Sequence, residues 1–286
     1  ASEDFHMTKD SQRAKAEAFR AMHDRSRVLV LPNAWDAMSA RFIEEAGARA
    51  IATTSAGVAF SLGYPDGEYA PRQEIVSAIA RIARVIDVPL SADIESGFGA
   101  TADEVGETAR QIIEAGAIGI NLEDSTGDPA QPLYDLETAV GRVKAARAAG
   151  AATGIPLVIN ARTDALIAMK GDRESLLAEA IRRANAFREA GADSLFPLGL
   201  NGNEEISRAV RSINGPMNLI FRPGIPSVAE LAKLGVARLS LGTSITLSAL
   251  AVTRRIAREV LSDGTYSSLG ESVSYPEANK LMASRT

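Results

Sequence analysis

Eight short apolar runs alternate with longer amphipathic segments along almost the whole chain. Runs of this length are typical of buried strands, whereas the segments between them repeat their apolar positions at helical spacing. Four helical segments end alike, in EEAGARA, EAGAIGI, EAGADSL and KLGVARL, where a glycine is expected to stop the helix before the next strand. The expected strands lie at 28–32, 50–55, 90–95, 118–123, 157–162, 194–199, 218–221 and 238–242.

Regular alternation of strand and helix predicts a parallel sheet, and eight units predict a closed (β/α)8 (TIM) barrel of the α/β class. The alternative is a doubly wound open sheet, which usually has a glycine-rich turn after its first strand. Here that turn reads LPNAWD, without such glycines. Because no Pro/Gly/Ser-rich linker divides the 286 residues, we expect one catalytic barrel domain at 8–263, with an added helix over 8–24. A more polar extension at 264–286 has helical potential near its end.

Residue usage excludes several kinds of chemistry. The chain has no cysteine, so disulfides, thiolate nucleophiles, iron–sulfur clusters and cysteine zinc sites are excluded. Only two histidines occur, His6 and His23, too few for a histidine-rich zinc site or a convincing catalytic triad. The reaction must therefore depend on carboxylates, arginine, hydroxyls, amides and a metal.

The charge pattern gives expectations about partners and location. The net charge is -5 and no basic block occurs, which argues against nucleic acid or an anionic membrane as a partner. No apolar run approaches the roughly 20 residues of a membrane-spanning helix, and the first residues lack the apolar region of a signal peptide. We expect a cytoplasmic protein.

The segment SADIESGFG at 91–99 ends one of these strands with two carboxylates, Asp93 and Glu95. Residues two apart on a strand point to the same face, and two carboxylates on one face need a cation between them. A hard divalent ion such as Mg²⁺, or Mn²⁺ in its place, takes oxygen ligands of this kind. The alternative is that one carboxylate caps the helix beginning near Ala102 while the other faces solvent.

Further polar residues follow the other expected strands, and in a (β/α)8 barrel all of them would meet at one end. Each has a simpler explanation: a turn cap for Ser55, a turn role for Asp66, a solvated acid for Glu123, a structural ion pair for Arg162, and backbone satisfaction for the asparagines. Their convergence favours function. These candidates are Ser55, Ala56, Gly57, Asp66, Glu123, Asn160, Arg162 and Asn218.

Together these side chains suggest one chemistry. Asp93, Glu95 and Glu123 would hold the cation, partly through water. Arg162 would pair bidentately with a substrate carboxylate, which the backbone N–H groups of 55–57 could also receive. A metal chelated by a 2-oxo or 2-hydroxy acid would stabilise negative charge on an enolate oxygen. A Schiff-base aldolase is excluded because the lysines of the helices, loops and tail are not on strands; these are Lys144, Lys170, Lys233 and Lys280.

The segments LPNAWDAMSAR, TTSAGVAFSLGYPD, SADIESGFG, INLEDS and INARTDA resemble the isocitrate lyase/phosphoenolpyruvate mutase superfamily over residues 28–250. The resemblance implies a magnesium-dependent enzyme that makes or breaks a C–C or P–C bond of a small 2-oxo or 2-hydroxy carboxylate, beside an enolpyruvate-like intermediate. It implies that Asp93 is the carboxylate nearest the metal, that Asp66 is an acid near the reacting group, and that Asn218 is a polar pocket residue. It also implies a homotetramer, or a dimer, with exchanged C-terminal helices.

Two departures from the family pattern narrow the reaction. The lyases carry a Lys-Lys-Cys-Gly-His segment, and the phosphonate-processing members a lysine and an asparagine, where this chain has STGDPAQPLYD at 125–135. This loop leaves Tyr134, Asp128 or water as the proton donor. Where the lyases have a glutamate after Phe-Pro, this chain has Leu198, which predicts a smaller or more apolar substrate.

Three functions follow from these patterns. The first is a carbon–carbon lyase or decarboxylase acting on a small 2-oxo dicarboxylate such as oxaloacetate, or on a substituted malate. The second is phosphonopyruvate hydrolysis or mutation. The third is a non-catalytic binder of 2-oxo acids that has lost its loop acid.

Overall fold

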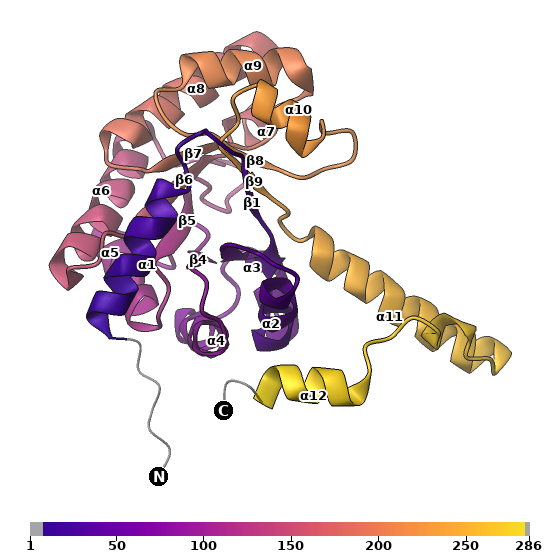
Figure 1. Ribbon diagram of the computed structural model, residues 1–286. Helices are drawn as coiled ribbons and strands as arrows, with labels where there is room; N and C mark the ends of the chain where they lie inside the picture. Colours follow the sequence, from indigo (N-terminus) through magenta and orange to yellow (C-terminus); the bar gives the residue numbers. More distant parts are fainter. Residues whose placement is uncertain (1–7, 284–286) are drawn as a thin grey trace.

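The computed structural model describes residues 8–283, and every expected strand is present in it (Figure 1). The first expected run forms β1 and continues past Pro32 into the short β2. The nine strands are β1 (Leu29–Leu31), β2 (Asn33–Ala34), β3 (Ile51–Thr53), β4 (Leu90–Asp93), β5 (Gly119–Glu123), β6 (Val158–Thr163), β7 (Ser194–Pro197), β8 (Asn218–Ile220) and β9 (Arg238–Ser240).

All strand pairs are parallel and follow the order of a barrel. One sheet runs β2-β3-β4-β5-β6-β7 and the other β1-β9-β8. A parallel bridge between Leu195 and Met217 joins β7 to the residue before β8, and β1 leads directly into β2. The chain therefore forms the predicted (β/α)8 barrel, in which β1 and β2 together occupy one strand position.

The helices begin and end where local chemistry dictates. Capping boxes start three of them, at Asp36, Thr101 and Ser227. All four predicted glycine stops have left-handed backbone, at Gly47, Gly116, Gly191 and Gly235, a conformation that only glycine adopts without steric cost. The helices are α1 (Lys9–Ala21), α2 (Ala37–Glu45), α3 (Ser55–Leu62), α4 (Arg72–Val85), α5 (Ala102–Glu114), α6 (Leu136–Thr153), α7 (Ala165–Ala168), α8 (Arg173–Glu189), α9 (Gly202–Ser212), α10 (Val228–Lys233), α11 (Ser244–Asp263) and α12 (Tyr275–Ala283), with a 3-10 turn at Ser267–Leu269.

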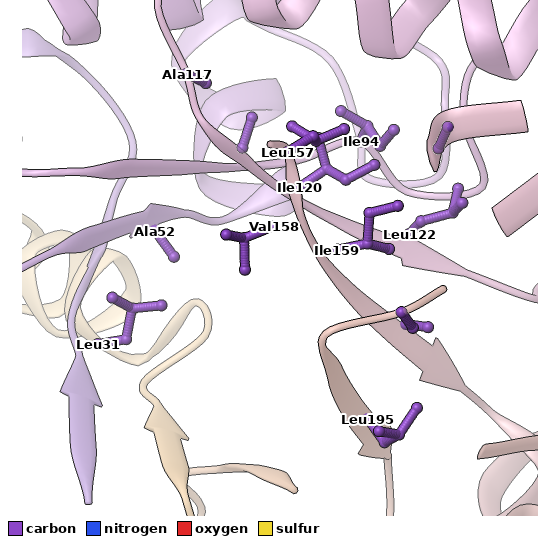
Figure 2. Close-up of a cluster of buried hydrophobic side chains, with 14 of the residues drawn as sticks. Leu31, Ala52, Ile94, Ala117, Ile120, Leu122, Leu157, Val158, Ile159 and Leu195 are labelled. Carbon is purple, nitrogen blue, oxygen red and sulfur yellow. The ribbon is translucent and has the colours of Figure 1, made fainter. Parts of the chain in front are cut away.

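The main hydrophobic core lies between the strands and the surrounding helices. Ile120, Ile159 and Leu195 are fully buried members of it (Figure 2). Burying such a side chain stabilises the fold by roughly 1.5–3 kcal/mol. Residues that alternate with these along the same strands, such as Asn121 and Asn160, are polar and line a cavity inside the barrel. Strand alternation thus separates an apolar outer layer from a polar interior.

Helix α1, which the sequence predicts as an addition at 8–24, packs at the N-terminal ends of the strands. The Gln12 amide donates to the carbonyl of Ile113 at 2.6 Å, and Phe19 is fully buried. At Gly119 of β5, an added Cβ would lie 3.0 Å from the Phe19 ring. The end of the barrel opposite the expected site is therefore closed by this helix.

Helix α11 leaves the barrel and projects away from it, and α12 returns toward α2 (Figure 1). Within α11 only Thr246 is buried, and the backbone of Leu281 accepts a hydrogen bond from Arg41 at 3.3 Å. The helix expected near the chain's end is present as α12, while residues 284–286 of the extension lie outside the described residues. The domain boundary at 264 stays a prediction.

No helix within residues 8–283 is long and apolar enough to cross a bilayer. The cytoplasmic location, and the absence of nucleic-acid and membrane partners, stay predictions.

His23 follows α1 and is buried against it. Its ring meets Phe19 edge to face at 5.0 Å, and its Nδ1 atom lies 2.9 Å from the Phe19 carbonyl oxygen. Burial, assisted by the nearby positive charge of Arg238, lowers the pKa of His23 to about 4. The folded protein therefore keeps this ring neutral at pH values where an exposed histidine is protonated.

This burial predicts an acid-sensitive contribution to stability. Above pH 6.5 the ring is neutral in both states; between pH 6.5 and about 4 only the unfolded chain takes up the proton, so the folded state loses about 3 kcal/mol as the pH falls. Urea unfolding of the wild type and of His23→Gln, which keeps a donor, at pH 7 and pH 4.5 measures this loss. The variant should lose less stability than the wild type, and equal losses would contradict the assignment.

Candidate active site

The C-terminal ends of the strands surround a cavity of about 110 Å³. Five predicted site residues line it: Ser55, Asp66, Asp93, Asn160 and Arg162. The convergence expected from the barrel is therefore present. The remaining lining residues are Asn33, Ala52, Thr53, Thr54, Ser91, Asn121, Phe196, Ile220, Arg238, Ser240, Gly242 and Thr243.

Asp93 ends β4, and several donors fix its orientation. Its Oδ2 atom accepts the Ser55 N–H at 3.2 Å, and its Oδ1 atom accepts the Asn121 side-chain amide at 3.1 Å. The Asp93 N–H in turn donates to the Thr53 hydroxyl at 2.8 Å. A carboxylate held in this way loses little conformational entropy when it binds a ligand.

Asn160 supports Asp93 from a distance. Its side-chain amide donates to the Asn121 Oδ1 atom at 2.9 Å, and Asn121 donates to Asp93. The two asparagines thus form a hydrogen-bond chain from β6 through β5 to β4. Asn160, predicted to contact substrate, lines the cavity and also positions Asp93, whereas the Asn218 amide is buried and donates to the Ser240 hydroxyl at 3.3 Å.

The spacing predicted that Glu95 lies on the same strand as Asp93, and this prediction is wrong. Strand β4 ends at Asp93, and Glu95 has left-handed backbone with φ of 50° in the following turn. The two carboxylates remain electrostatic neighbours: burial first, then the charges of Asp93 and Asp66, raise the pKa of Glu95 to about 8. Without a cation, this part of the site disfavours full ionisation.

Two carboxylates surround the Arg162 guanidinium. Its Nη1 atom lies 2.9 Å from Glu123, and its Nε and Nη2 atoms bond Asp164 at 2.6 and 2.7 Å. Burial raises the pKa of Glu123 although Arg162 opposes this shift. These three contacts leave two of the five guanidinium N–H groups for a substrate carboxylate, and that role of Arg162 stays a prediction.

The start of α3 brings Ser55 to the cavity wall, whereas Ala56 and Gly57 do not line the cavity. The Ser55 N–H bonds Asp93, and the Gly57 N–H donates to the Thr54 hydroxyl cap at 3.5 Å. A Cβ on Gly57 would lie 2.6 Å from the Thr54 side chain, so close packing requires glycine here. Ala56 is buried beside them. In this structure the Ser55 and Gly57 backbone N–H groups thus donate to protein side chains, and ligand binding by this turn stays a prediction.

Asp66 stands at the mouth of the cavity. The residue is exposed, but its carboxylate accepts a hydrogen bond from the Ser55 side chain. Partial burial, and then the charge of Asp93, raise the pKa of Asp66. A carboxyl group with a raised pKa beside a hydroxyl is suited to proton transfer.

Glu68 contacts the candidate ligand Glu95 from outside the cavity, and sequence reasoning missed it. Its N–H donates to the Glu95 carboxylate at 2.7 Å, and its own carboxylate accepts the Phe98 N–H at 2.9 Å. All three residues have positive φ, of 60°, 50° and 52° in chain order. Strained backbone of this kind is concentrated at functional sites. In the sequence, the only signal for Glu68 is that an acidic residue follows the Pro-Asp-Gly turn.

The loop proton donors proposed from the sequence lie outside the cavity. Segment 125–135 folds on itself through a bridge between Ser125 and Leu133. Tyr134 lies under the Arg142 guanidinium at 4.2 Å and lines a separate surface depression. Asp128 is exposed and accepts the Ala130 N–H at 2.8 Å. Neither loop residue lines the cavity, whereas Asp66 and Ser55 do, and the identity of the proton donor stays a prediction.

Leu198 lines a second cavity, of about 270 Å³, beside the first. Phe196 and Ile220 line both cavities. The wall of the second cavity is mixed, because Asn201 and Arg222 line it beside Leu198. The apolar residues of this wall include Ile167, Pro197, Leu200, Ile206, Leu219, Ile225 and Pro226.

The acidic residues fit a divalent cation held mostly through water. No three His, Cys, Asp or Glu side chains within residues 8–283 are close enough to hold a metal directly. Asp93 nevertheless lines the cavity, and burial together with the charges of Asp93 and Asp66 raises the pKa of Glu95. One direct carboxylate with outer carboxylates acting through water is typical of Mg²⁺.

Magnesium binding is therefore expected to stabilise the folded protein. At roughly 100-fold excess over Kd, the gain should be about 3 kcal/mol, measured as a rise in Tm over that in EDTA. Asp93→Asn should abolish the rise because it removes the oriented carboxylate. Asp103→Asn, a change of an exposed acid on α5, is the matched control and should keep it. An undiminished rise in Asp93→Asn would exclude Asp93 as a ligand.

The chain is similar to several known proteins. The family model described as phosphoenolpyruvate phosphomutase matches residues 19–261. The chain is 37% identical to 2-methylisocitrate lyase of Escherichia coli over 194 residues, 65% of this chain and 63% of that protein. It is 29% identical to oxaloacetate decarboxylase of Pseudomonas paraeruginosa over 271 residues, 91% of each chain. A solved phosphonopyruvate hydrolase complex with oxalate and Mg²⁺ has a TM-score of 0.83 and 29% identity, covering 94% of this chain and 95% of that one.

Proposed function

This chain belongs to the phosphoenolpyruvate phosphomutase family, within the isocitrate lyase/phosphoenolpyruvate mutase superfamily, and we propose that it is a magnesium-dependent carbon–carbon lyase. Its substrate is a small 2-oxo or 2-hydroxy dicarboxylate, and its reaction resembles that of an oxaloacetate decarboxylase. The observation that carries the proposal is the oriented Asp93 carboxylate in a cavity that also contains Arg162 and Asp66. The similarity to oxaloacetate decarboxylase of Pseudomonas paraeruginosa supports the choice of reaction.

Three carboxylates would hold the ion. Asp93 is oriented by Ser55 and Asn121 and would be the direct ligand, while Glu95 and Glu123 would act through water. When bound, magnesium supplies positive charge that stabilises an enolate-like oxygen of the substrate. The raised pKa of Glu95 fits this arrangement, because an added cation would offset the burial and the neighbouring negative charges that raise it.

A side chain of this protein would donate the proton that the reaction requires. In decarboxylation the bond from C3 to a carboxyl group breaks, CO₂ leaves, and the electron pair remains in an enolate that is then protonated at C3. Asp66, hydrogen-bonded to Ser55 at the cavity mouth, is the group placed to deliver that proton. This route needs neither the cysteine of the lyase loop nor Tyr134, which lies in another depression.

The second cavity narrows the substrate class. Its wall combines apolar side chains beside Leu198 with Asn201 and Arg222, and Leu198 removes the negative charge that the lyases' glutamate would place there. An apolar substituent on the substrate could instead occupy it, separated from the reacting centre by Phe196 and Ile220. We therefore favour oxaloacetate or an alkyl-substituted malate. A malate would instead break its C2–C3 bond: the 2-hydroxyl loses its proton, its oxygen becomes a carbonyl, and the electron pair stays on C3 until that carbon is protonated.

Release of a 2-oxo acid tests the proposed reaction. With Mg²⁺, oxaloacetate should yield pyruvate faster than the metal-catalysed background, and Asp93→Ala should reduce kcat by about 10²-fold or more. Equal rates for both proteins would refute it. Phosphorus NMR with phosphonopyruvate provides the contrast: faster phosphate release there would instead support P–C cleavage. Tight oxalate binding without any turnover would support a non-catalytic binder.

We further propose a homotetramer, or a dimer, built through α11. This helix projects from the barrel with exposed apolar side chains, among them Leu247 and Leu250, at 54% and 50% exposure. Exposed apolar side chains on a projecting helix are typical of an interface with another chain. A second copy of this protein is the partner that the family resemblance implies.

Light scattering after size exclusion tests the assembly. The wild type should exceed the 30.1 kDa of one chain, and Leu250→Lys should shift it toward the monomer because a charge would be buried at the interface. Thr253→Lys, at a polar position of the same helix, is the control. A monomeric wild type would overturn the proposal.

A further inference from the structure

Arg238 at the start of β9 is a buried cation without an ionic partner. It is 2% exposed, and its Nε and Nη1 atoms are buried without a hydrogen-bond partner. No hydrogen bond or ion pair joins its guanidinium to another residue within 8–283; its nearest ring contact is Phe19, at 5.9 Å. An unpaired buried charge is strongly unfavourable, so a residue of this kind needs a compensating group.

This arginine lines the same cavity as the candidate active site. Asp93 and Arg162 are also part of the cavity wall, and Asp93 is the negative charge that acts on Arg238. Asp93 already accepts hydrogen bonds from Ser55 and Asn121, and it makes none with Arg238. A positive group without a bound acceptor thus adjoins the space that the substrate is expected to enter.

The contrast with Arg162 is informative. All three Arg162 nitrogens bond carboxylates of Glu123 and Asp164. Of the two guanidinium groups that line this cavity, Arg238 is therefore the one without a carboxylate partner. A new anion can bind Arg238 without displacing a protein carboxylate.

Neighbouring polar atoms also lack partners. The Ser91 hydroxyl and the Asn160 Oδ1 atom are buried and unpartnered, and both residues line the cavity. A carboxylate at Arg238 could accept its N–H groups and the Ser91 hydroxyl, while water could bridge to Asn160. Water alone would satisfy the hydrogen bonds but leave the guanidinium charge uncompensated.

We propose that Arg238 is an anion-binding residue of the active-site cavity and that it receives a carboxylate group of the substrate. The anion-binding role follows from the cavity itself, whereas its identification as a substrate carboxylate rests on the proposed function. The enzyme would thus select a dicarboxylate through two arginines. Arg162 is already paired with protein carboxylates, whereas Arg238 gains a carboxylate partner only when the substrate binds.

Malonate, a dicarboxylate that the proposed reaction does not consume, tests this assignment in the absence of metal. Calorimetry and Tm should show malonate binding to the wild type, and Arg238→Met should weaken it by about 10-fold or more because a charge-assisted hydrogen bond is lost. Arg208→Met removes the same charge from an exposed pair with Glu174 and should bind malonate like the wild type. Equal malonate affinity in the wild type and Arg238→Met would overturn the proposal.

A second measurement separates binding from structure. Because the unliganded guanidinium is unpaired, Arg238→Met should keep or raise the Tm of the free protein, whereas a structural arginine would lower it. If the methionine variant does not fold, Arg238→Lys keeps the charge without the fork geometry and should bind malonate less tightly than the wild type. Undiminished binding in that variant would also contradict the assignment.

A comparison with formate, which has a single carboxylate, tests whether the site binds any small anion or prefers a dicarboxylate. Malonate should bind the wild type at least 10-fold more tightly than formate if the second carboxylate contributes. Equal affinities would overturn the assignment to a dicarboxylate substrate. Arg238-dependent malonate binding in a protein without lyase activity would support the anion site and refute only the proposed reaction.

Discussion

Mutual repulsion among carboxylates at the ends of neighbouring parallel strands is the constraint around which this site is arranged. Asp93, Glu95 and Glu123 approach one another because β4 and β5 are paired in register and their carboxyl ends meet at one rim. The protein offsets part of this repulsion with amide donors to Asp93 and with Arg162 beside Glu123. Burial and the remaining repulsion from Asp93 and Asp66 together raise the pKa of Glu95, which is the physical reason to expect a cation there.

Rigidity in the barrel interior serves the same purpose. The hydrogen-bond chain from Asn160 through Asn121 fixes Asp93 from two strands away. Helix α1 closes the opposite end, so the polar interior faces only the cavity that carries the candidate chemistry. A buried polar network is favourable when its members are satisfied, and the unpartnered atoms of Arg238 and Ser91 are therefore informative exceptions.

Much of the fold and part of the site could be predicted from local pattern. Strand positions and helix-ending glycines were readable because strand alternation and left-handed glycine depend on neighbouring residues. The shared position of Asp93 and Arg162 followed from the rule that barrel strands end at one rim. Glu95 was misplaced because the strand ends two residues earlier, at a point that hydrophobic pattern does not define.

The sequence by itself determined the barrel, the end at which polar residues gather and the family to which the chain belongs, since these depend on periodicity and on motif order. Only the tertiary structure decided which charges find partners. It paired Arg162 with Asp164, placed Tyr134 under Arg142 away from the cavity, and left Arg238 unpaired inside it. Pairing depends on side chains from strands far apart in the chain reaching the same few ångströms, and no local pattern records that distance.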